Sequence, residues 1–182
     1  FAMKNILVTG AAGFIGFHVS RRLLELGRSV VGVDNLNPYY DVELKRSRLE
    51  RLRLYSDFAF YHADIQDLDG LKEIFHGHEI GSVCNLAAQA GVRYSLKDPF
   101  SYQKSNLEGF LNLLELAREH DIDNFVYASS SSVYGNNKKV PFSVEDRVDT
   151  PISLYAATKK ANELMAHAYS HLYGIPCTGL RY

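Results

Sequence analysis

One stretch near the start of the chain, residues 5–16, decides the fold, and it reads NILVTGAAGFIG. An apolar, β-branched run leads into three glycines with GxxGxxG spacing, and the start of a helical pattern follows. In such a unit the first glycine permits a tight turn, the second admits a pyrophosphate to the backbone, and the third lets helix and strand approach. The N–H groups and dipole of the helix N-terminus favour the phosphates. The residues expected at the cofactor are Gly10, Gly13, Phe14, Ile15 and Gly16.

Outward from this stretch, β-branched apolar runs alternate with helical patterns along the whole chain. The predicted strands are residues 5–9, 29–33, 58–62, 82–86, 125–128 and 176–180. The predicted helices are residues 14–26, 42–54, 68–75, 102–120 and 154–173. Strict alternation of this kind, with right-handed crossovers, predicts an α/β fold. We expect one Rossmann-like domain over residues 1–182, a doubly wound parallel sheet with helices on both faces.

The two ends of the chain and two of its loops stand out from this alternation. We interpret Phe1 and Ala2, which precede Met3, as residues added in cloning. The chain stops directly after the strand at residues 176–180, so we expect that a C-terminal substrate-binding region is missing. The loops at residues 35–41 and 133–153 both leave carboxyl ends of strands, where ligands of open α/β sheets bind. We therefore expect both loops to be functional.

Composition argues against several classes of partner. Twenty basic and twenty-one acidic side chains give a net charge of −1, which argues against a general electrostatic grip on nucleic acid. No apolar run approaches the ~18–20 residues that span a bilayer, so we expect no membrane segment. Cys84 and Cys177 lack metal-site or disulfide spacing, and the histidines do not cluster. We expect free thiols, no metal site and a cytoplasmic location.

An acidic residue ends the second predicted strand, 18 residues after the last glycine of the loop. Asp34 at this place is suited to accept hydrogen bonds from both ribose hydroxyls of a dinucleotide. The next residue is Asn35 and not arginine, so a 2′-phosphate would meet a carboxylate with no adjacent cation. The sequence therefore favours NAD over NADP. The alternative is an aspartate that only caps the loop.

Tyr155 and Lys159 lie four residues apart in a predicted helix and share one face. A lysine ammonium favours a phenolate, so we expect it to lower the tyrosine pKa and make a general base. A second pair with this spacing, Tyr134 and Lys138, spans a glycine and two asparagines and is interpreted as a chance match. The serine run at residues 129–132 ends a strand, and the residue pattern does not choose among its hydroxyls.

These motifs together resemble the extended short-chain dehydrogenase/reductase family over essentially the whole chain. The resemblance implies that Ser130, Tyr155 and Lys159 are catalytic, with Ser132 and Arg93 facing the substrate. It adds cofactor contacts to those of the glycine loop and Asp34. These are Asn35, Asp64, Ile65, Leu86, Ala87, Ala88, Asn106, Tyr155 and Lys159.

The resemblance also separates reactions within the family. Dehydratase and decarboxylase relatives carry an acid where this chain has Ser132, which favours an epimerase. Residues 37–45, 48–52 and 88–95 are similar to UDP-glucuronate 4-epimerases of the capsule-biosynthesis type. We interpret the basic helix at residues 42–54 physically as a solvated face and not as a phosphate site.

The implied reaction is reversible oxidation of a UDP-sugar at C4. Tyr155 takes the hydroxyl proton, Ser130 shares it, and a 4-keto sugar is reduced on its opposite face, with NAD as cofactor. UDP-glucuronate would become UDP-galacturonate. The alternatives are a UDP-glucose 4-epimerase or other NAD-dependent sugar-nucleotide enzyme, and a non-catalytic NAD-binding or sensing domain. Relatives commonly dimerise, which here would use the helices at residues 102–120 and 154–173.

Overall fold

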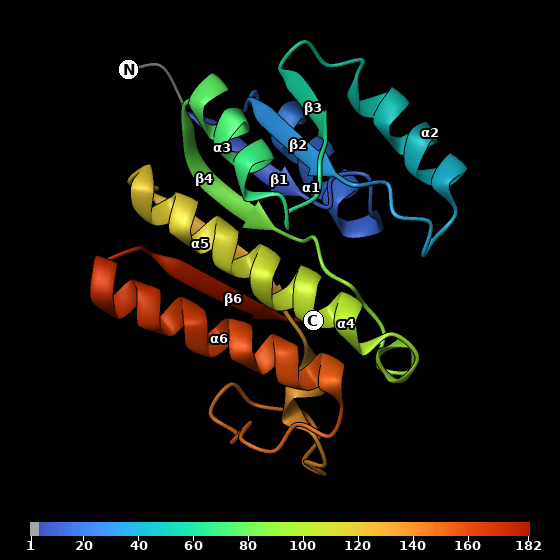
Figure 1. The fold of residues 1–182 in the computed structure, drawn as a ribbon, viewed down its shortest axis with the longest axis vertical. Coiled ribbons are helices and arrows are strands. Elements are labelled where there is room, and N and C mark those ends of the chain that lie inside the picture. Colours follow the sequence, from blue (N-terminus) through green and yellow to red (C-terminus); the bar gives the residue numbers. More distant parts are fainter. Residues whose placement is uncertain (1–3) are drawn as a thin grey trace.

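The computed structural model describes residues 4–182, and Phe1 and Ala2, interpreted as cloning residues, lie outside them. Six parallel strands form one sheet in the order β3-β2-β1-β4-β5-β6 (Figure 1). The strands are β1 Asn5–Thr9, β2 Val30–Asp34, β3 Phe58–His62, β4 Ile80–Asn85, β5 Asn124–Ser129 and β6 Cys177–Arg181. This order reverses direction beside β1, as in dinucleotide-binding folds. The predicted Rossmann-like sheet is confirmed.

Helices follow the strands as expected, with bounds that differ by a few residues. The longer helices are α1 Phe14–Glu25, α2 Val42–Leu52, α3 Leu68–Gly77, α5 Gly109–Glu119 and α6 Leu154–Tyr173. α6 matches its predicted bounds because Ser153 caps its start and Gly174 ends it with a left-handed φ of 72°. β2 runs one residue further than predicted, so Asp34 belongs to the sheet.

Two hydrophobic cores cover the two faces of the sheet. Along β1, Ile6 and Val8 join one core and Leu7 joins the other, because successive strand residues point to opposite faces. The first core receives α1 and α2, and the second receives α3, α5 and α6. Figure 1 shows α5 and α6 side by side in front of the sheet, with α1 behind it. This layering leaves the carboxyl ends of the strands for a ligand.

The predicted helix at residues 102–120 is wrong in its start and in its continuity. A short helix, α4 Pro99–Tyr102, begins earlier because Asp98 accepts a hydrogen bond from Ser101 N and proline fits the first turn. A π-helical turn, η2 Gln103–Glu108, then separates α4 from α5. It brings Gly109 against Ile65, where a Cβ would lie 2.5 Å from Ile65 Cγ1. Turns of this kind often lie at functional sites.

The two long loops have different positions. The loop at residues 35–41 borders a cleft described below, as expected. The loop at residues 133–153 contributes no residue to that cleft, and it forms a small cluster of Val133, Tyr134 and Val148 instead. Its expected role at the ligand is therefore not supported. No helix within residues 4–182 is both long and apolar enough to cross a bilayer.

Candidate active site

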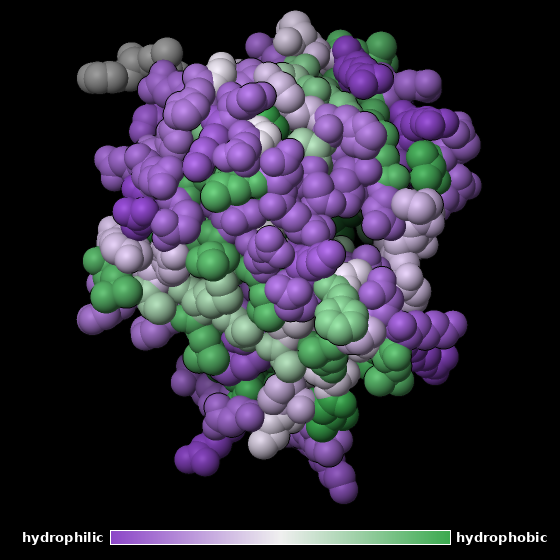
Figure 2. Space-filling model, in the orientation of Figure 1, coloured by the Kyte–Doolittle hydropathy of each residue, from purple (hydrophilic) through white to green (hydrophobic). Residues whose placement is uncertain are grey.

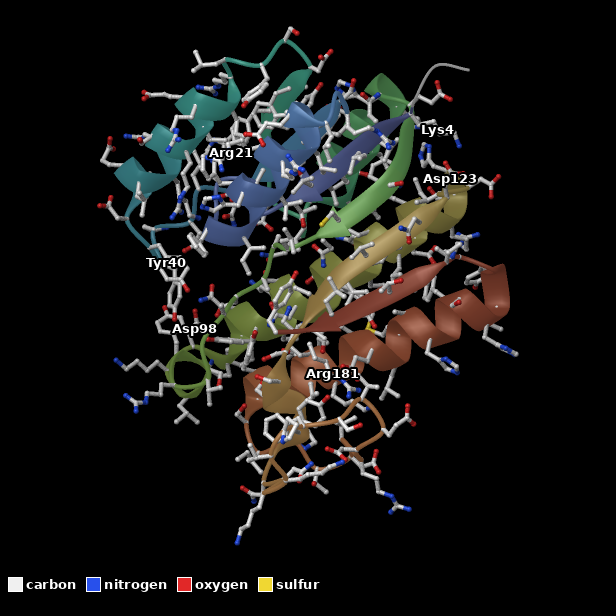
Figure 3. All side chains as sticks on the ribbon, turned by 180° about the vertical axis from the view of Figure 1, so that it is seen from behind. Lys4, Arg21, Tyr40, Asp98, Asp123 and Arg181 are labelled. Carbon is white, nitrogen blue, oxygen red and sulfur yellow. The ribbon has the colours of Figure 1, made fainter. Side chains whose placement is uncertain are left out.

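A cleft of about 820 Å³ lies at the carboxyl ends of the strands, where β1 and β4 diverge in their connections. One end is formed by the glycine loop and the end of β2, and the other by β5 and the start of α6. Figure 2 shows a hollow on this face between the upper and lower parts of the molecule. Figure 3 shows Tyr40 and Asp98, both cleft-lining residues, on facing sides of the gap. Residues of both predicted motifs, the glycine loop and the Tyr155–Lys159 pair, therefore line one cleft.

The glycine loop meets the geometric conditions for a phosphate site. Gly10 has a φ of 67°, and a Cβ there would lie 2.9 Å from Ala87 N. A Cβ on Gly16 would lie 2.0 Å from the carbonyl oxygen of Gly10, so only glycine allows this turn. Gly13 is the N-cap of α1, and neither a capping side chain nor an acidic residue occupies the first turn. The positive end of the helix is therefore available to an anion.

Asp34 lies at this end of the cleft and is buried. Its Oδ2 accepts a hydrogen bond from Ala12 N at 3.1 Å, and its Oδ1 accepts one from Leu36 N at 2.8 Å. These bonds tie the end of β2 to the glycine loop, so part of its role is the loop-capping alternative. The carboxylate still lines the cleft and can reach a ligand.

The structure overturns the expectation that no cation is adjacent to Asp34. Lys45 Nζ lies 3.3 Å from Asp34 Oδ1, and both side chains are buried. Arg48 Nη1 donates to the carbonyl oxygen of Ala12 at 3.2 Å, and both cations line the cleft. The interpretation of this helix as a solvated face is wrong on this side. A usable signal was the spacing of Lys45 with the buried Leu49 and Leu52, which places a lysine on the apolar stripe of α2.

Most of the other expected cofactor residues line the same cleft. They are Phe14, Ile15, Asn35, Asp64, Ile65, Leu86, Ala87 and Ala88. Asn35 Nδ2 donates to Asp64 Oδ2 at 2.8 Å, which joins the loops after β2 and β3. Thr9 Oγ1 accepts hydrogen bonds from Leu86 N and Ala87 N and so sets the path of the chain after β4.

The mouth of the cleft includes tyrosines that the motifs did not single out. Tyr39 and Tyr40 come from the loop after β2, and both line the cleft. Gly91, with a φ of 95°, gives Tyr39 its place, since a Cβ there would lie 2.6 Å from the Tyr39 hydroxyl. The Tyr39 ring also meets Tyr94 with centroids 4.9 Å apart. The sequence shows a tyrosine pair in a long loop. Its place in the cleft could not be predicted, because it depends on contacts with the loop that contains Gly91 and Tyr94.

Ser130, Tyr155 and Lys159 line the opposite end of the cleft together. Tyr155 is in the first turn of α6, and Lys159 is one turn further, with Nζ 6.0 Å from the Tyr155 ring centroid. Lys159 Nζ donates to the carbonyl oxygen of Ala128 at 3.0 Å. The strand end of β5 and the start of α6 thus bring the three side chains to one wall, in agreement with the predicted grouping.

The expected pKa relation between this tyrosine and lysine is not what the structure shows. Burial raises the pKa of Tyr155, and the hydroxyl of Ser130 opposes part of that rise. Burial lowers the pKa of Lys159 to about 8. The pKa of Tyr155 is therefore raised, against the expectation that Lys159 lowers it. Desolvation is the largest cause of both shifts because Tyr155 is half-buried and Lys159 is buried.

The structure distinguishes the serines that the sequence pattern left equivalent. Ser129 Oγ donates to Glu163 Oε1 at 2.7 Å, so its hydroxyl is already engaged. Ser132 donates to Ser130 Oγ at 2.8 Å and is not in the cleft wall, against its expected contact with substrate. Ser130 lines the cleft beside Tyr155. The second Tyr-x-x-x-Lys pair lies away from the cleft, with Tyr134 stacked on Phe142.

Two further expected site residues lie outside the cleft wall, and their roles stay predictions. Asn106 is buried and does not line the cleft, and its side chain bonds Gln89 N at 2.8 Å and Gln89 O at 3.1 Å. It also donates to Thr158 Oγ1 on α6, so it ties the loop at Gln89, which lines the cleft, to that helix. Arg93 is exposed at the start of η1 Tyr94–Leu96 and is not part of the cleft wall.

Comparison with known proteins supports a relationship over the whole chain. A family model described as GDP-mannose 4,6 dehydratase matches residues 7–182. Protein CapI of Staphylococcus aureus is 52% identical over 98% of this chain and 53% of its own length. UDP-glucuronate 4-epimerase 2 of Arabidopsis thaliana is 54% identical over 98% of this chain and 41% of its own length.

Solved structures give the same picture. A UDP-glucuronic acid 4-epimerase from Bacillus cereus, in complex with UDP-glucuronic acid and NAD, matches with a TM-score of 0.87 and 37% identity, covering 98% of this chain and 56% of that one. A UDP-glucose 4-epimerase from Thermotoga maritima, with UDP-glucose, matches with a TM-score of 0.86 and 37% identity, covering 98% and 55%. The chain spans about half the length of the curated relatives it matches. It belongs to the family described as GDP-mannose 4,6 dehydratase.

Proposed function

We propose that this chain is the NAD-binding part of a UDP-sugar 4-epimerase. One observation carries the proposal. A single cleft has a glycine phosphate loop at one end and the Ser130, Tyr155 and Lys159 side chains at the other. A binding module needs only the first of these, whereas an enzyme that oxidises and reduces a bound sugar needs both.

The residues present fit a dinucleotide along this cleft. Gly10 and Gly16 leave space that any side chain would fill, and the N-terminus of α1 favours a pyrophosphate. Asp34 and Asn35 would face the adenosine, and Ala87 and Ala88 lie further along the cleft toward Tyr155. NAD bound there would supply a reversible hydride acceptor for the sugar C4 and, when oxidised, a positive charge in the cleft that favours a phenolate.

The chain's own groups account for the proton steps. Tyr155 takes the proton of the C4 hydroxyl as general base. It returns the proton after the 4-keto sugar has rotated to present its opposite face. Ser130 contacts the tyrosine and shares that proton. Lys159, held by the Ala128 carbonyl, supplies a cation one helical turn away. Because burial raises the pKa of Tyr155, the base depends on positive charge in the cleft to ionise near neutral pH.

UDP-glucuronate is the proposed substrate. The support is the similarity to UDP-glucuronate 4-epimerase 2 at 54% identity. The solved UDP-glucuronic acid and UDP-glucose 4-epimerase structures do not separate the two sugars, since each is 37% identical to this chain. Ser132 stands where dehydratases carry an acid, and its hydroxyl is turned to Ser130. This arrangement offers no carboxylate for eliminating water at that place, which favours epimerisation over dehydration.

The test is incubation of the full gene product with UDP-glucuronate and, separately, with UDP-glucose, with the anomeric protons followed by NMR. We expect UDP-galacturonate to form without a net redox change and the rate to fall about 10²–10⁴-fold in Tyr155→Phe. Tyr134→Phe, which removes the hydroxyl of the second pair, serves as the matched control and should keep the activity. Conversion of UDP-glucose alone would correct the substrate. No conversion of either sugar by a protein that binds NADH would favour a non-catalytic NAD-binding domain.

We also propose a homodimer through α5 and α6. Figure 2 shows apolar surface over these two helices on the viewed face. Leu111 on α5 and Leu164 and Leu172 on α6 are exposed, the last two by 59% and 66%. Pairing these faces would bury them against a second copy. Light scattering should give twice the monomer mass for the wild type and the monomer mass for Leu164→Glu.

A further inference from the structure

An ion pair lies behind the serine run, outside the wall of the cleft. It joins Arg181 on β6 to Glu163 on α6, and the two side chains are 19% and 13% exposed. Arg181 Nε donates to Glu163 Oε1 at 2.8 Å and Nη2 donates to Oε2 at 2.9 Å, which is the bidentate geometry that a guanidinium and a carboxylate favour. Figure 3 shows Arg181 beside α6. The proton steps proposed above use neither residue.

Glu163 continues the helix face that carries the proposed base. Tyr155, Lys159 and Glu163 recur at intervals of four residues on α6, so they share one face. The first two line the cleft. Glu163 meets the end of β5 instead, where Ser129 Oγ donates to its Oε1 at 2.7 Å. Within residues 4–182, only Lys159 and Glu163 join α6 to β5 through side-chain hydrogen bonds.

Ser129 stands in the middle of the strand end that places the other two groups. The carbonyl of Ala128, the residue before it, accepts the bond from Lys159 Nζ at 3.0 Å. The hydroxyl of Ser130, the residue after it, bonds Tyr155. Planar peptide units leave only two soft dihedral angles per residue, so a shift of Ser129 moves both neighbours with it. A side chain that fixes Ser129 therefore fixes the Lys159 acceptor and the Ser130 hydroxyl together.

The carboxylate of Glu163 has no capacity left for a further role. A carboxylate offers about four lone-pair positions. Oε1 accepts bonds from Ser129 and Arg181, and Oε2 accepts a bond from Arg181 and has Lys160 Nζ at 3.5 Å. Burial raises the pKa of this carboxyl, but the bonds and charges of these three neighbours outweigh burial and lower the pKa. The group is therefore ionised and occupied at neutral pH, which suits it to hold its neighbours and not to move a proton.

We propose that Glu163 is a positioning residue for the proton step, with Arg181 as the counter-ion that orients it. The inference rests on the proposed epimerase function. Through Ser129, the carboxylate keeps the Lys159 acceptor and the Ser130 hydroxyl in register with the base. The bidentate pair also ties β6 to the helix that carries the base.

The test is a double-mutant cycle in the full gene product, with UDP-sugar turnover followed by the NMR assay. Glu163→Met removes both connections, whereas Ser129→Ala removes the link to the serine run and leaves the ion pair in place. We expect each variant to lower kcat about 10–100-fold with KM within about threefold of the wild type. The double variant should be no slower than the slower single variant, because both changes break one connection. Glu163→Gln, which keeps an oxygen for the Ser129 hydroxyl, should restore part of kcat.

The pH profile adds a readout that a loss of stability alone does not move. Burial raises the pKa of Tyr155 and the Ser130 hydroxyl opposes that rise, so a displaced Ser130 leaves the pKa higher. Since turnover needs the deprotonated base, the acid limb of kcat should move to higher pH by about half a unit or more in Ser129→Ala and Glu163→Met. The other titratable groups that face Tyr155 are the same in every variant, and they are Lys159, Tyr40 and Tyr102.

Asp146→Asn is the matched control. The Asp146 side chain is also 13% exposed, accepts bonds from three neighbours in its own loop and lies outside the cleft wall. This variant should keep the wild-type kcat and acid limb. Tyr134→Phe loses a bond from Arg181 Nη1 at 3.2 Å but leaves both bonds of Arg181 to Glu163 in place, so it should keep them too.

Thermal melting identifies the folded variants, and Ser129→Ala decides the point if Glu163→Met does not fold. A wild-type kcat in folded Ser129→Ala, or losses that add in the double variant, would overturn the inference. The proposed function would then still stand on the turnover of the wild type. If the wild type converts no UDP-sugar, the proposed function falls and the inference falls with it.

Discussion

Each end of the cleft contains one buried lysine, and the protein holds the two in different ways. At the adenosine end, Lys45 lies 3.3 Å from the carboxylate of Asp34. At the catalytic end, Lys159 is 4% exposed, donates to the neutral carbonyl of Ala128, and pairs with no carboxylate among residues 4–182. Burial lowers the pKa of Lys159 to about 8, whereas the charge of Lys45 is balanced by its partner.

The two lysines differ in whether an opposite charge compensates them, and we expect a structural role for the Lys45 charge and a functional role for the Lys159 charge. A buried pair offsets much of the cost of desolvating both ions, and losing one member leaves the other uncompensated. A buried ammonium beside a carbonyl has no such offset, so it costs stability at neutral pH. Such a cost is retained where chemistry needs a perturbed group, and the Tyr155 wall is the place where we propose that chemistry. The lysine at the phosphate end is compensated by its partner, and the lysine at the Tyr155 end is held at an electrostatic cost.

The largest effect is expected from adding a side chain to the glycine loop, where the start of α1 lies against the backbone of Gly10. In Gly16→Ala the new Cβ would lie 2.0 Å from the Gly10 carbonyl oxygen, an atom of the backbone that cannot move aside cheaply. We expect a loss of about 4–5 kcal/mol in unfolding free energy and at least 100-fold weaker NADH binding. Urea unfolding and NADH fluorescence measure both. Gly77→Ala, where a Cβ meets nothing within 4 Å, should leave both unchanged or slightly improved.

The next effect tests whether the Lys45 charge is structural. Lys45→Met leaves Asp34 buried without its cation, so we expect a loss of about 3 kcal/mol in unfolding free energy. The double variant Lys45→Met with Asp34→Asn should recover part of that loss because no charge remains. Urea unfolding of the two variants decides the point. A single variant as stable as wild type would show that the pair is not structural.

The opposite sign is expected at the catalytic end. Lys159→Met removes an uncompensated buried charge and fills the same volume, so the unfolding free energy should rise by about 1–3 kcal/mol. The same variant should lose UDP-sugar turnover, which is the usual trade between stability and function. Urea unfolding at pH 7 and the NMR assay are the two measurements. A destabilised Lys159→Met would mean that the bond to Ala128 outweighs the desolvation of the charge.

The smallest effect is a pH dependence of that stability difference. The folded pKa of Lys159, about 8, is below its unfolded value of about 10.4, so between these values the unfolded state binds more protons. Wild-type stability should therefore rise with pH in this window, relative to Lys159→Met. From pH 7 to pH 9.5 we expect the gap between the two proteins to narrow by about 1–2 kcal/mol. Burial raises the pKa of Tyr155, so this tyrosine stays mostly protonated up to pH 9.5 and contributes little to the change. A constant gap would show that Lys159 has an ordinary pKa.

Much of the fold was predictable because its signals are local. The GxxGxxG spacing identifies the turn at Gly10 and Gly16 from bond geometry alone, and Tyr155 and Lys159 share a helix face by their spacing. The start of α4 was also readable from Asp98-Pro99 and was missed. The break between α4 and α5 was not readable, because the π-helical turn lies beside a contact of Gly109 with Ile65, which comes from another part of the chain.

The site was predicted less completely, and the failures share a cause. Asn106 bonds Gln89, and Arg93 is exposed to solvent. Both placements depend on the path of the loop between β4 and α4, which residue spacing does not predict. The pKa of Tyr155 went in the unexpected direction because burial is a property of all its neighbours. Motif spacing predicts which side chains share an element, and it does not predict the dielectric around them.

The sequence by itself determined the alternating strands and helices, the phosphate loop and the pairing of Tyr155 with Lys159. These depend on backbone geometry and on the periodicity of one element at a time. Only the tertiary structure decided which cations meet Asp34, which serine hydroxyl in the cleft wall lies beside Tyr155 and which lysine has no compensating charge. Electrostatic energies depend on distance and burial across elements far apart in the chain, and folding alone brings those groups together.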